Sequence, residues 1–296
     1  MQFRHLVHRK INFAAWDTRL QAESLIPIYN YSWYLNAATK KRWNAIVGGD
    51  YEVLLPLPFN RKLFGLPQVY QSPMTQQLGV GFTGISKDPK DLHKALQSIP
   101  LYYWRVLLPL SAQLLTQAQQ FLHRRSNLIL PLDRQHEQLQ LGYSRSLRRR
   151  LRKAEAVYRV EELQDIEALI SLYRQQVGAR AGLSDWAYQR IRAIIQECLD
   201  REQGQIKVVL DREGKVQARA FFAGRQRIGN LFGASTAAGR DGFAMHYLLD
   251  RAIAENAGQA KVFDFEGSEI PGVRAFFQSF GAQEEFYWTY QRRFAR

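Results

Sequence analysis

The chain has 296 residues, of which 46% are hydrophobic, and this excludes a disordered chain while allowing two domains of ordinary size. Its formal net charge of +14 favours anionic partners, namely nucleic acid, the phosphates of CoA or a nucleotide, or a membrane surface. The single cysteine, Cys198, excludes an intramolecular disulfide, and the histidines show no metal-ligand spacing, so we expect a reducing compartment and no metal site.

The first half of the chain alternates helical and extended patterns. Apolar periodicity predicts helices over residues 17–39, 89–98 and 111–123. Alternating runs bounded by turn residues predict strands at 42–47, 51–57, 102–108 and 128–132, and an extended segment near 78–82.

From residue 157 onward the pattern is more regular. Helices are predicted over residues 166–177, 188–199 and 242–256, and again from Pro271. Strands are predicted at 206–210, 216–223, 228–234, 261–266 and 284–293. The first half shows a similar but less regular order of predicted helices and strands. We therefore expect an α/β fold in two domains, residues 1–135 and 136–296.

A strand that carries two carboxylates lies near the end of the chain. Alternation along this strand places Asp264 and Glu266 on one side, while Phe263 and Phe265 pack the other. Unpaired acids in apolar surroundings are costly, so we expect both acids to serve chemistry, either by accepting a proton from an amine or by holding its ammonium form. A structural ion pair with Arg219, Arg274 or another cation is the alternative.

A dense basic segment opens the second half. Its predicted helix begins after Ser144 or Ser146 as the N-cap. Four arginines fall close to one face of this helix, namely Arg145, Arg148, Arg149 and Arg152. Such a face suits the phosphates of a tRNA end, a nucleotide-linked sugar or CoA, although a solvated face paired with nearby glutamates explains the same pattern.

These motifs resemble a known family. The run DFEGS at 264–268, followed by IPGVRAFFQSFGA and an aromatic strand at 285–290, resembles the end of the GNAT-like domain of the Fem-type peptidoglycan aminoacyltransferases and their bacterial relatives. The basic run at 143–154 is similar to the helix that opens the second half of such proteins, and residues 54–58 and 76–80 follow a pattern of the relatives. The resemblance implies tandem GNAT-like acyl-CoA N-acyltransferase domains of α/β (α+β) class, with mixed central sheets flanked by helices.

The resemblance also implies an activity. It points to an acyl- or aminoacyltransferase that forms an amide on an amine acceptor, with aminoacyl-tRNA as the donor and a cell-wall precursor as the acceptor. Acyl-CoA is the alternative donor, no permanently bound cofactor is expected, and a homodimer is left open. A non-catalytic, basic GNAT-like protein that binds nucleic acid or anionic lipid is the alternative from a different class.

A GNAT domain binds the CoA pyrophosphate at the N-terminus of the helix after its fourth strand. The resemblance places this loop at 235–242 and makes Ser235, Gly239 and Arg240 donor-binding candidates. Thr236 and Asp241 depart from the family pattern, so a plain helix lead-in is the alternative. Backbone N–H groups of residues 231–235 are the candidate donors to the oxyanion.

The remaining candidates serve the acceptor and the leaving group. Tyr287 is a candidate acid for the leaving group, with core packing as the alternative. Ser268, Gln76 and Gln77 are acceptor-binding candidates, although Ser268 also suits an N-cap and the glutamines also suit a packed turn. No apolar run approaches the roughly 20 residues that cross a bilayer, and no signal-peptide core opens the chain, so we expect a cytoplasmic protein that is not transmembrane.

Overall fold

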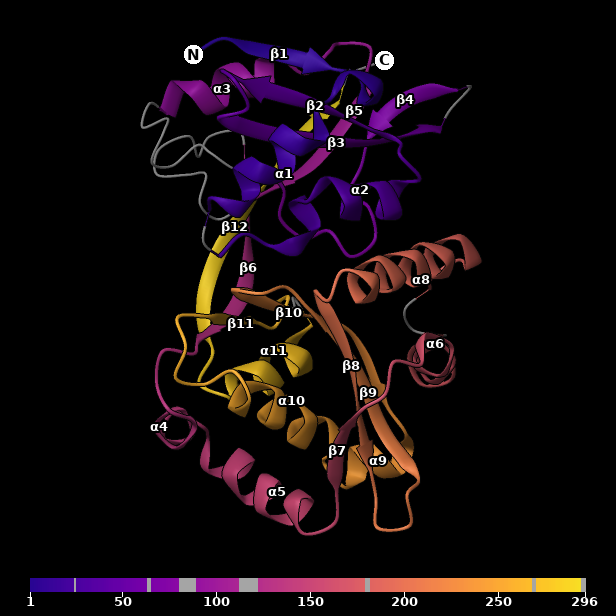
Figure 1. The fold of residues 1–296 in the computed structure, drawn as a ribbon, viewed down its shortest axis with the longest axis vertical. Coiled ribbons are helices and arrows are strands. Elements are labelled where there is room, and N and C mark those ends of the chain that lie inside the picture. Colours follow the sequence, from indigo (N-terminus) through magenta and orange to yellow (C-terminus); the bar gives the residue numbers. More distant parts are fainter. Residues whose placement is uncertain are drawn as a thin grey trace. The chain divides into compact units, whose positions relative to one another are not determined.

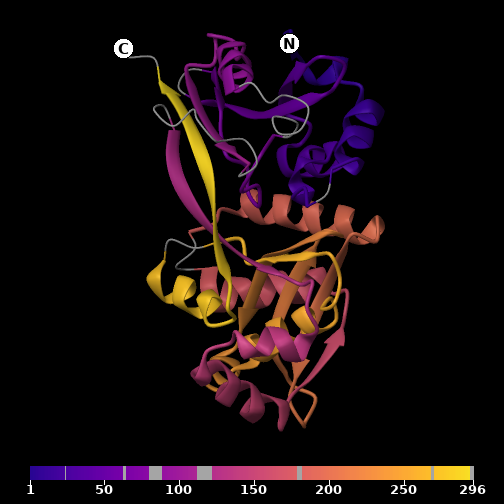
Figure 2. The same ribbon diagram turned by 90° about the vertical axis from the view of Figure 1, so that its left-hand side faces the viewer.

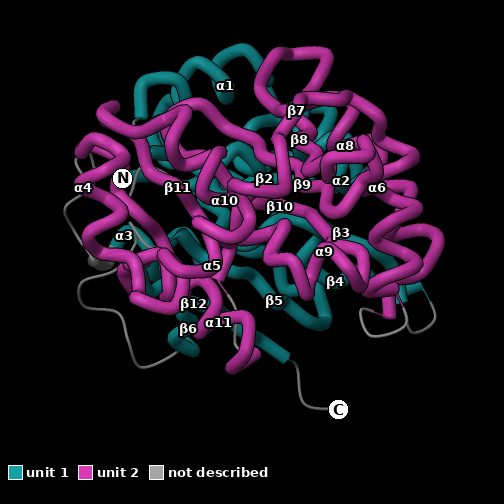
Figure 3. The backbone as a smooth tube through the Cα atoms, turned by 90° about the horizontal axis from the view of Figure 1, so that it is seen from below, with its two compact units in different colours: residues 1–126, 285–296 teal, residues 127–284 magenta. Residues whose placement is uncertain are grey.

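The chain divides into two compact units (Figure 3). A computed structural model of the protein describes residues 1–23, 25–62, 65–79, 89–111, 122–178, 182–267 and 270–293. The first unit comprises Met1–Ser126 and Glu285–Arg296, and the second comprises Asn127–Glu284. The second unit thus begins before residue 136, and the end of the chain belongs to the first unit.

The first unit is built on a mixed sheet of strand order β1-β2-β3-β4-β5-β12. Its strands are β1 (Phe3–Leu6), β2 (Trp43–Gly48), β3 (Val53–Lys62), β4 (Leu66–Val69), β5 (Arg105–Leu110) and β12 (Gln283–Arg293). Its helices are η1 (His8–Lys10), α1 (Phe13–Gln21), η2 (Ile28–Asn30), α2 (Ser32–Thr39) and α3 (Pro89–Gln97). The periodicity missed β1 and β4, which are short, and the helix expected at 111–123 lies largely outside the described residues.

In the first unit, a second segment of the chain lies beside β5 beyond the end of β4. β4 pairs with β5 in parallel only at Gln68 and Val69. Beyond this point Leu78 forms a parallel bridge to Leu110. The side chain of Asn30 fixes this segment, because it donates to the Gln77 carbonyl at 3.1 Å and accepts from the N–H of Gly79 at 2.8 Å. The edge of β5 beyond β4 is therefore covered by backbone.

The second unit is built on a sheet of strand order β6-β11-β10-β9-β8-β7. Its strands are β6 (Leu122–Pro131), β7 (Arg159–Glu162), β8 (Gly204–Leu210), β9 (Val216–Ala223), β10 (Arg227–Ser235) and β11 (Val262–Asp264). Its helices are α4 (His136–Leu141), α5 (Arg145–Glu155), α6 (Ile166–Tyr173) with the π-helical turn η5 (Arg174–Gly178), α8 (Asp185–Asp200), α9 (Ala237–Asp241), α10 (Ala244–Ala254) and α11 (Pro271–Gln278).

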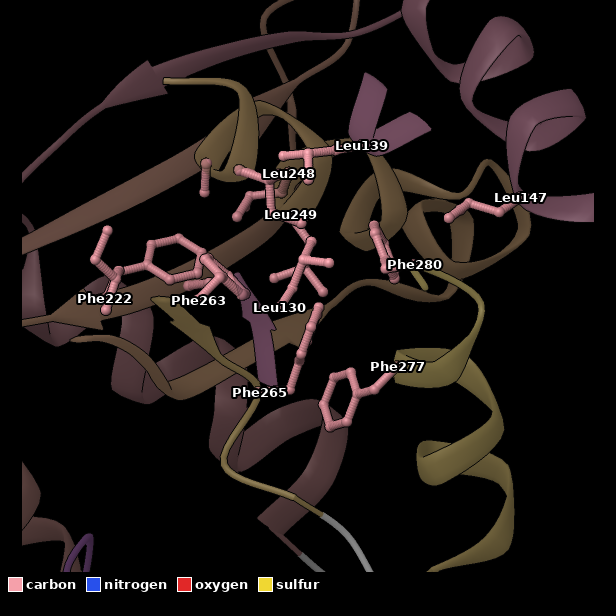
Figure 4. Close-up of a cluster of buried hydrophobic side chains, with 14 of the residues drawn as sticks. Leu130, Leu139, Leu147, Phe222, Leu248, Leu249, Phe263, Phe265, Phe277 and Phe280 are labelled. Carbon is pink, nitrogen blue, oxygen red and sulfur yellow. The ribbon is translucent and has the colours of Figure 1, made fainter. Parts of the chain in front are cut away.

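Helices cover both faces of this sheet (Figure 1). The helices α6 and α8 lie on one face, and α4, α5, α10 and α11 lie on the other. The core on the second face joins leucines of α5 and α10 to aromatic rings of β9, β11 and α11 (Figure 4). Phe263 and Phe265 are buried there, with ring centroids 4.9 Å apart, which confirms that these two residues pack the core.

The two units share one pattern of strand pairing. Counted from β1 in the first unit and from β7 in the second, the first four strands are antiparallel, the fourth and fifth are parallel, and the last pair is antiparallel. The last strand of each sheet comes from the other half of the chain, because β12 pairs with β5 whereas β6 pairs with β11. The chain passes from the first unit into the second along β6 and returns along β12 (Figure 2).

Local sequence signals explain the helix ends of the second unit. The hydroxyl of Ser144 accepts from the N–H of Leu147 and caps α5, so the first of the two expected caps is the one used. Pro271 occupies the first turn of α11, as predicted. Across the described ranges, no helix has the length and apolar character needed to cross a membrane.

Candidate functional site

The parallel strands β10 and β11 separate after a short stretch of pairing. They pair from Arg227 opposite Val262 to Gly229 opposite Asp264. β11 then ends, whereas β10 continues to Ser235. Among the described residues, no strand pairs with this side of β10 beyond Gly229. The backbone of residues 230–235 therefore carries N–H and C=O groups that a ligand lying along the strand can bind.

A β-bulge bends β10 at the same place. The register between β10 and β9 shifts between Asn230 and Phe232, which leaves Leu231 as the extra residue. Tyr173 of α6 stacks on Phe232 with ring centroids 4.0 Å apart and holds the strand next to the bulge. Bulges re-aim backbone groups and are common beside active sites. The segment 231–235, expected to supply oxyanion donors, is thus the part of β10 that lacks a β11 partner.

Asp264 lies in a buried ion pair on the same strands. Its carboxylate accepts from Arg227 Nε at 2.6 Å, from the Asn127 amide at 2.9 Å and from the N–H of Glu266 at 2.8 Å. The Asp264 side chain is 1% exposed and that of Arg227 is 5% exposed. A carboxylate held by three donors in the interior fixes β6, β10 and β11 together. The alternative of a structural ion pair therefore describes Asp264.

Glu266 lies at the point where the two strands separate. Its backbone has φ 60°, in the left-handed region, and Gly267 follows with φ 49°, so the chain turns here instead of extending the strand. A Cβ atom added to Gly229 would lie 3.3 Å from Glu266 Oε1, which places this carboxylate next to the last paired residue of β10. The turn ends the strand at Glu266, but the Glu266 carboxylate still lies on the side of the sheet to which Asp264 points, because Gly229 and Asp264 are paired residues.

The loop that leads into α9 is closed by its own side chains. The Thr236 hydroxyl caps α9 by accepting from the N–H of Gly239 at 2.9 Å, and it donates to the Gln217 amide oxygen at 2.8 Å. A Cβ atom at Gly239 would lie 2.1 Å from the Gln217 carbonyl oxygen, so this glycine serves close packing against β9. The Arg240 guanidinium donates to the Ser235 carbonyl and to Gln176, each at 2.9 Å. The three donor-binding candidates of this loop thus serve its own structure.

The arginines of α5 line a pocket of about 470 Å³ that lies within the second unit. Arg145, Arg148 and Arg152 contribute from α5, which confirms that these three share one face. Arg149, expected on the same face, is exposed and does not line the pocket. The helix α10 supplies the opposite wall with Tyr247, Asp250 and Arg251.

The structure places the other candidates in different surroundings. Tyr287 is half-buried in the part of β12 that belongs to the first unit, so it is not in one compact unit with Glu266. Gln77 is fully buried and Gln76 is half-buried, and the Gln77 amide donates to Gln76 Oε1 at 3.0 Å within the first unit. Ser268 lies outside the described residues.

Sequence reasoning missed the partners that complete these sites. Arg227 and Asn127 lie 37 and 137 residues from Asp264 along the chain, and Arg251 also lies far from the basic helix. No local spacing signals such pairs, because strand pairing and helix packing bring them together. In the sequence, the only sign of the Asp264 partners is that Arg227 and Asn127, both polar, stand beside apolar strand residues.

Comparison with known proteins agrees with this topology. Residues 142–272 match the family model described as an acetyltransferase (GNAT) domain. The crystal structure of FemX superposes with a TM-score of 0.68 at 14% identity, covering 97% of each chain. The C-terminal domain (DUF2156) of a putative lysylphosphatidylglycerol synthetase from Agrobacterium fabrum superposes with a TM-score of 0.56 at 14% identity, covering 95% of this chain and 92% of that one. A search of curated proteins finds no match. The fold expected from the sequence is confirmed.

Proposed function

Because residues 142–272 carry a GNAT acetyltransferase domain in a FemX-like fold, we propose that this protein transfers an acyl or aminoacyl group to an amine. The observation that carries the proposal is the unpartnered edge of β10, with the Glu266 carboxylate beside Gly229 at its start. Within the described residues the first unit has no equivalent edge, since its fourth strand, β4, ends at Val69, which is still paired with β5. The transfer site is therefore assigned to the second unit.

The geometry suits amide formation. The amine nitrogen attacks the carbonyl carbon of a thioester or ester, and the negative charge that develops on the carbonyl oxygen is stabilised by N–H groups of residues 231–235. Glu266 binds the ammonium form of the acceptor and accepts one of its protons, which frees the amine for attack. The new C–N bond forms as the C–S or C–O bond breaks, and a second proton lost by the attacking nitrogen leaves with the thiol or hydroxyl.

The donor proposed first is an aminoacyl-tRNA, and an acyl-CoA is second. The Fem resemblance favours the tRNA ester. The closed loop before α9 weighs against CoA, because Thr236 already occupies the N–H of Gly239 on which a pyrophosphate would lie. The proposed acceptor is an amine on a cell-wall precursor, which the same resemblance suggests.

A donor screen tests this proposal. The melting temperature is measured with CoA, acetyl-CoA, myristoyl-CoA, uncharged tRNA and aminoacyl-tRNA, because a ligand at 100 times its Kd adds about 2.7 kcal/mol of stability. The donor that stabilises the protein is then incubated with a panel of amines, and amide products are sought by mass spectrometry. Stabilisation by one acylated donor with an amide product supports the proposal.

Absence of any amide product with every donor would contradict it. Equal stabilisation by charged and uncharged tRNA, or by anionic vesicles, without product would instead favour a non-catalytic basic protein. The excess of unpaired arginines on α5 is the observation on which that second function rests.

A further inference from the structure

The pocket between α5 and α10 carries an excess of positive charge. Four of its lining residues are arginines, and two, Asp250 and Glu155, are acids. Among the described residues, the side chains of Arg145, Arg148 and Arg152 make no hydrogen bond or ion pair. The fourth arginine, Arg251, has a buried Nε with no hydrogen-bond partner. Four guanidinium groups thus surround one cavity with most of their donors unused.

Asp250, the buried acid of the pocket, is already bonded to protein side chains. The Asp250 side chain is 4% exposed and its carboxylate accepts from His136 Nε2 at 2.8 Å and from Arg251 at 3.3 Å. Tyr247 lies under the Arg251 guanidinium, 5.8 Å from its centre. Asp250 and Tyr247 therefore orient Arg251 without neutralising the three arginines of α5.

The basic stripe costs stability unless an anion shares it. The first turn of α5 has no acidic residue, and cations near a helix N-terminus oppose the helix dipole. Like charges three and four residues apart destabilise a helix by about 0.2–0.5 kcal/mol per pair. The pairs Arg145–Arg148 and Arg148–Arg152 have these spacings. A bound anion relieves both penalties.

We propose that the α5–α10 pocket binds a phosphate ester that carries at least two negative charges, such as a diphosphate or a nucleotide. Guanidinium groups match phosphate oxygens in bidentate geometry. Arg145 and Arg152 are about 10 Å apart along the helix axis, which suits two linked phosphates better than one. The volume of about 470 Å³ lies in the range of ligand pockets. This site does not depend on the proposed transfer activity, since it is built from α5 and α10 and not from the edge of β10.

Calorimetric titration with inorganic pyrophosphate and with ADP at low salt tests the site. The variant Arg148→Ala/Arg152→Ala is expected to bind each probe at least about tenfold more weakly than the wild type, which corresponds to 1.4 kcal/mol. Arg149→Ala removes a charge from the same helix outside the pocket and is the matched control, expected to change affinity by less than about threefold. The double variant should melt no lower than the wild type, because it relieves like-charge repulsion.

A short single-stranded RNA separates two sources of the phosphate. Competition between RNA and pyrophosphate, lost in the double variant, assigns the pocket to the backbone of a nucleic acid. Binding of ADP without competition by RNA assigns it to a small nucleotide. Failure of both pyrophosphate and ADP to saturate the wild type at millimolar concentration would overturn the proposal, as would equal weakening by Arg149→Ala and by the double variant.

Discussion

The ion pair between Asp264 and Arg227 is a deeply buried interaction of the second unit. Both side chains are almost fully buried, so neutralising one of them leaves an uncompensated charge in the interior. Asp264→Asn is expected to lower the free energy of unfolding by about 3–5 kcal/mol in urea denaturation. The double variant Asp264→Asn/Arg227→Met removes both charges and should recover part of that loss. A single variant within about 1 kcal/mol of the wild type would show that the pair does not hold the strands.

His246 provides a second test at the scale of one residue. It lies on α10 with its ring against Phe243 and Phe276, and its Nε2 accepts from the Arg150 guanidinium at 3.2 Å. Burial, together with the nearby Arg150 charge, lowers the pKa of His246 from 6.5 to about 4. The neutral ring is thus favoured in the folded state, as expected for a packing residue.

The sign of the pH effect follows from this lowered pKa. The unfolded chain binds a proton at His246 below pH 6.5 and the folded chain does not, so the stabilisation is complete above pH 6.5 and is lost as the pH falls toward 4. Between pH 7 and pH 5 the wild type should lose about 2 kcal/mol more stability than His246→Gln, which accepts from Arg150 but does not titrate. If urea denaturation shows that the wild type and His246→Gln lose the same free energy of unfolding between pH 7 and pH 5, this account is contradicted.

At the scale of elements, the turn from β10 into α9 is fixed by packing. Gly239→Ala places a Cβ atom against the backbone carbonyl of Gln217, and we expect a loss of about 1–3 kcal/mol in thermal unfolding. Gly272→Ala in α11 is the control, because no atom lies within 4 Å of its Cβ position, and it should be neutral or slightly stabilising. Unchanged stability of Gly239→Ala with weakened donor binding would instead make the loop a phosphate cradle.

At the scale of the whole molecule, local sequence patterns predict elements better than partners. Amphipathic periodicity found α6, α8 and α10, a basic run behind an N-cap serine found α5, and alternation found β8, β9 and β10, since each signal lies within about 20 residues. The exchange of β6 and β12 between the units was not predictable, because the apolar end of β6 and the aromatic middle of β12 do not specify which strand pairs with them.

In the candidate site, too, local spacing predicts which residues share a face but not where the chain turns. The Arg-rich face of α5 and the buried packing of Phe263 and Phe265 follow from residue spacing alone. The left-handed turn at Glu266 does not, because glutamate seldom adopts that conformation and only the following Gly267 hinted at it. Asp264 is held by three donors in the interior, whereas Glu266 follows the end of β11 and lies half-buried beside Gly229.

The rate of amide formation in Glu266→Gln tests the central assignment most directly. With the donor found in the screen, single-turnover transfer should slow by about 10²-fold or more, since the amide cannot accept the proton. Glu266→Gly is the companion variant, because it removes the carboxylate and glycine readily adopts the left-handed backbone of this position, and it should be equally inactive. Wild-type rates in both variants would contradict a transfer site at the start of the unpartnered β10 edge.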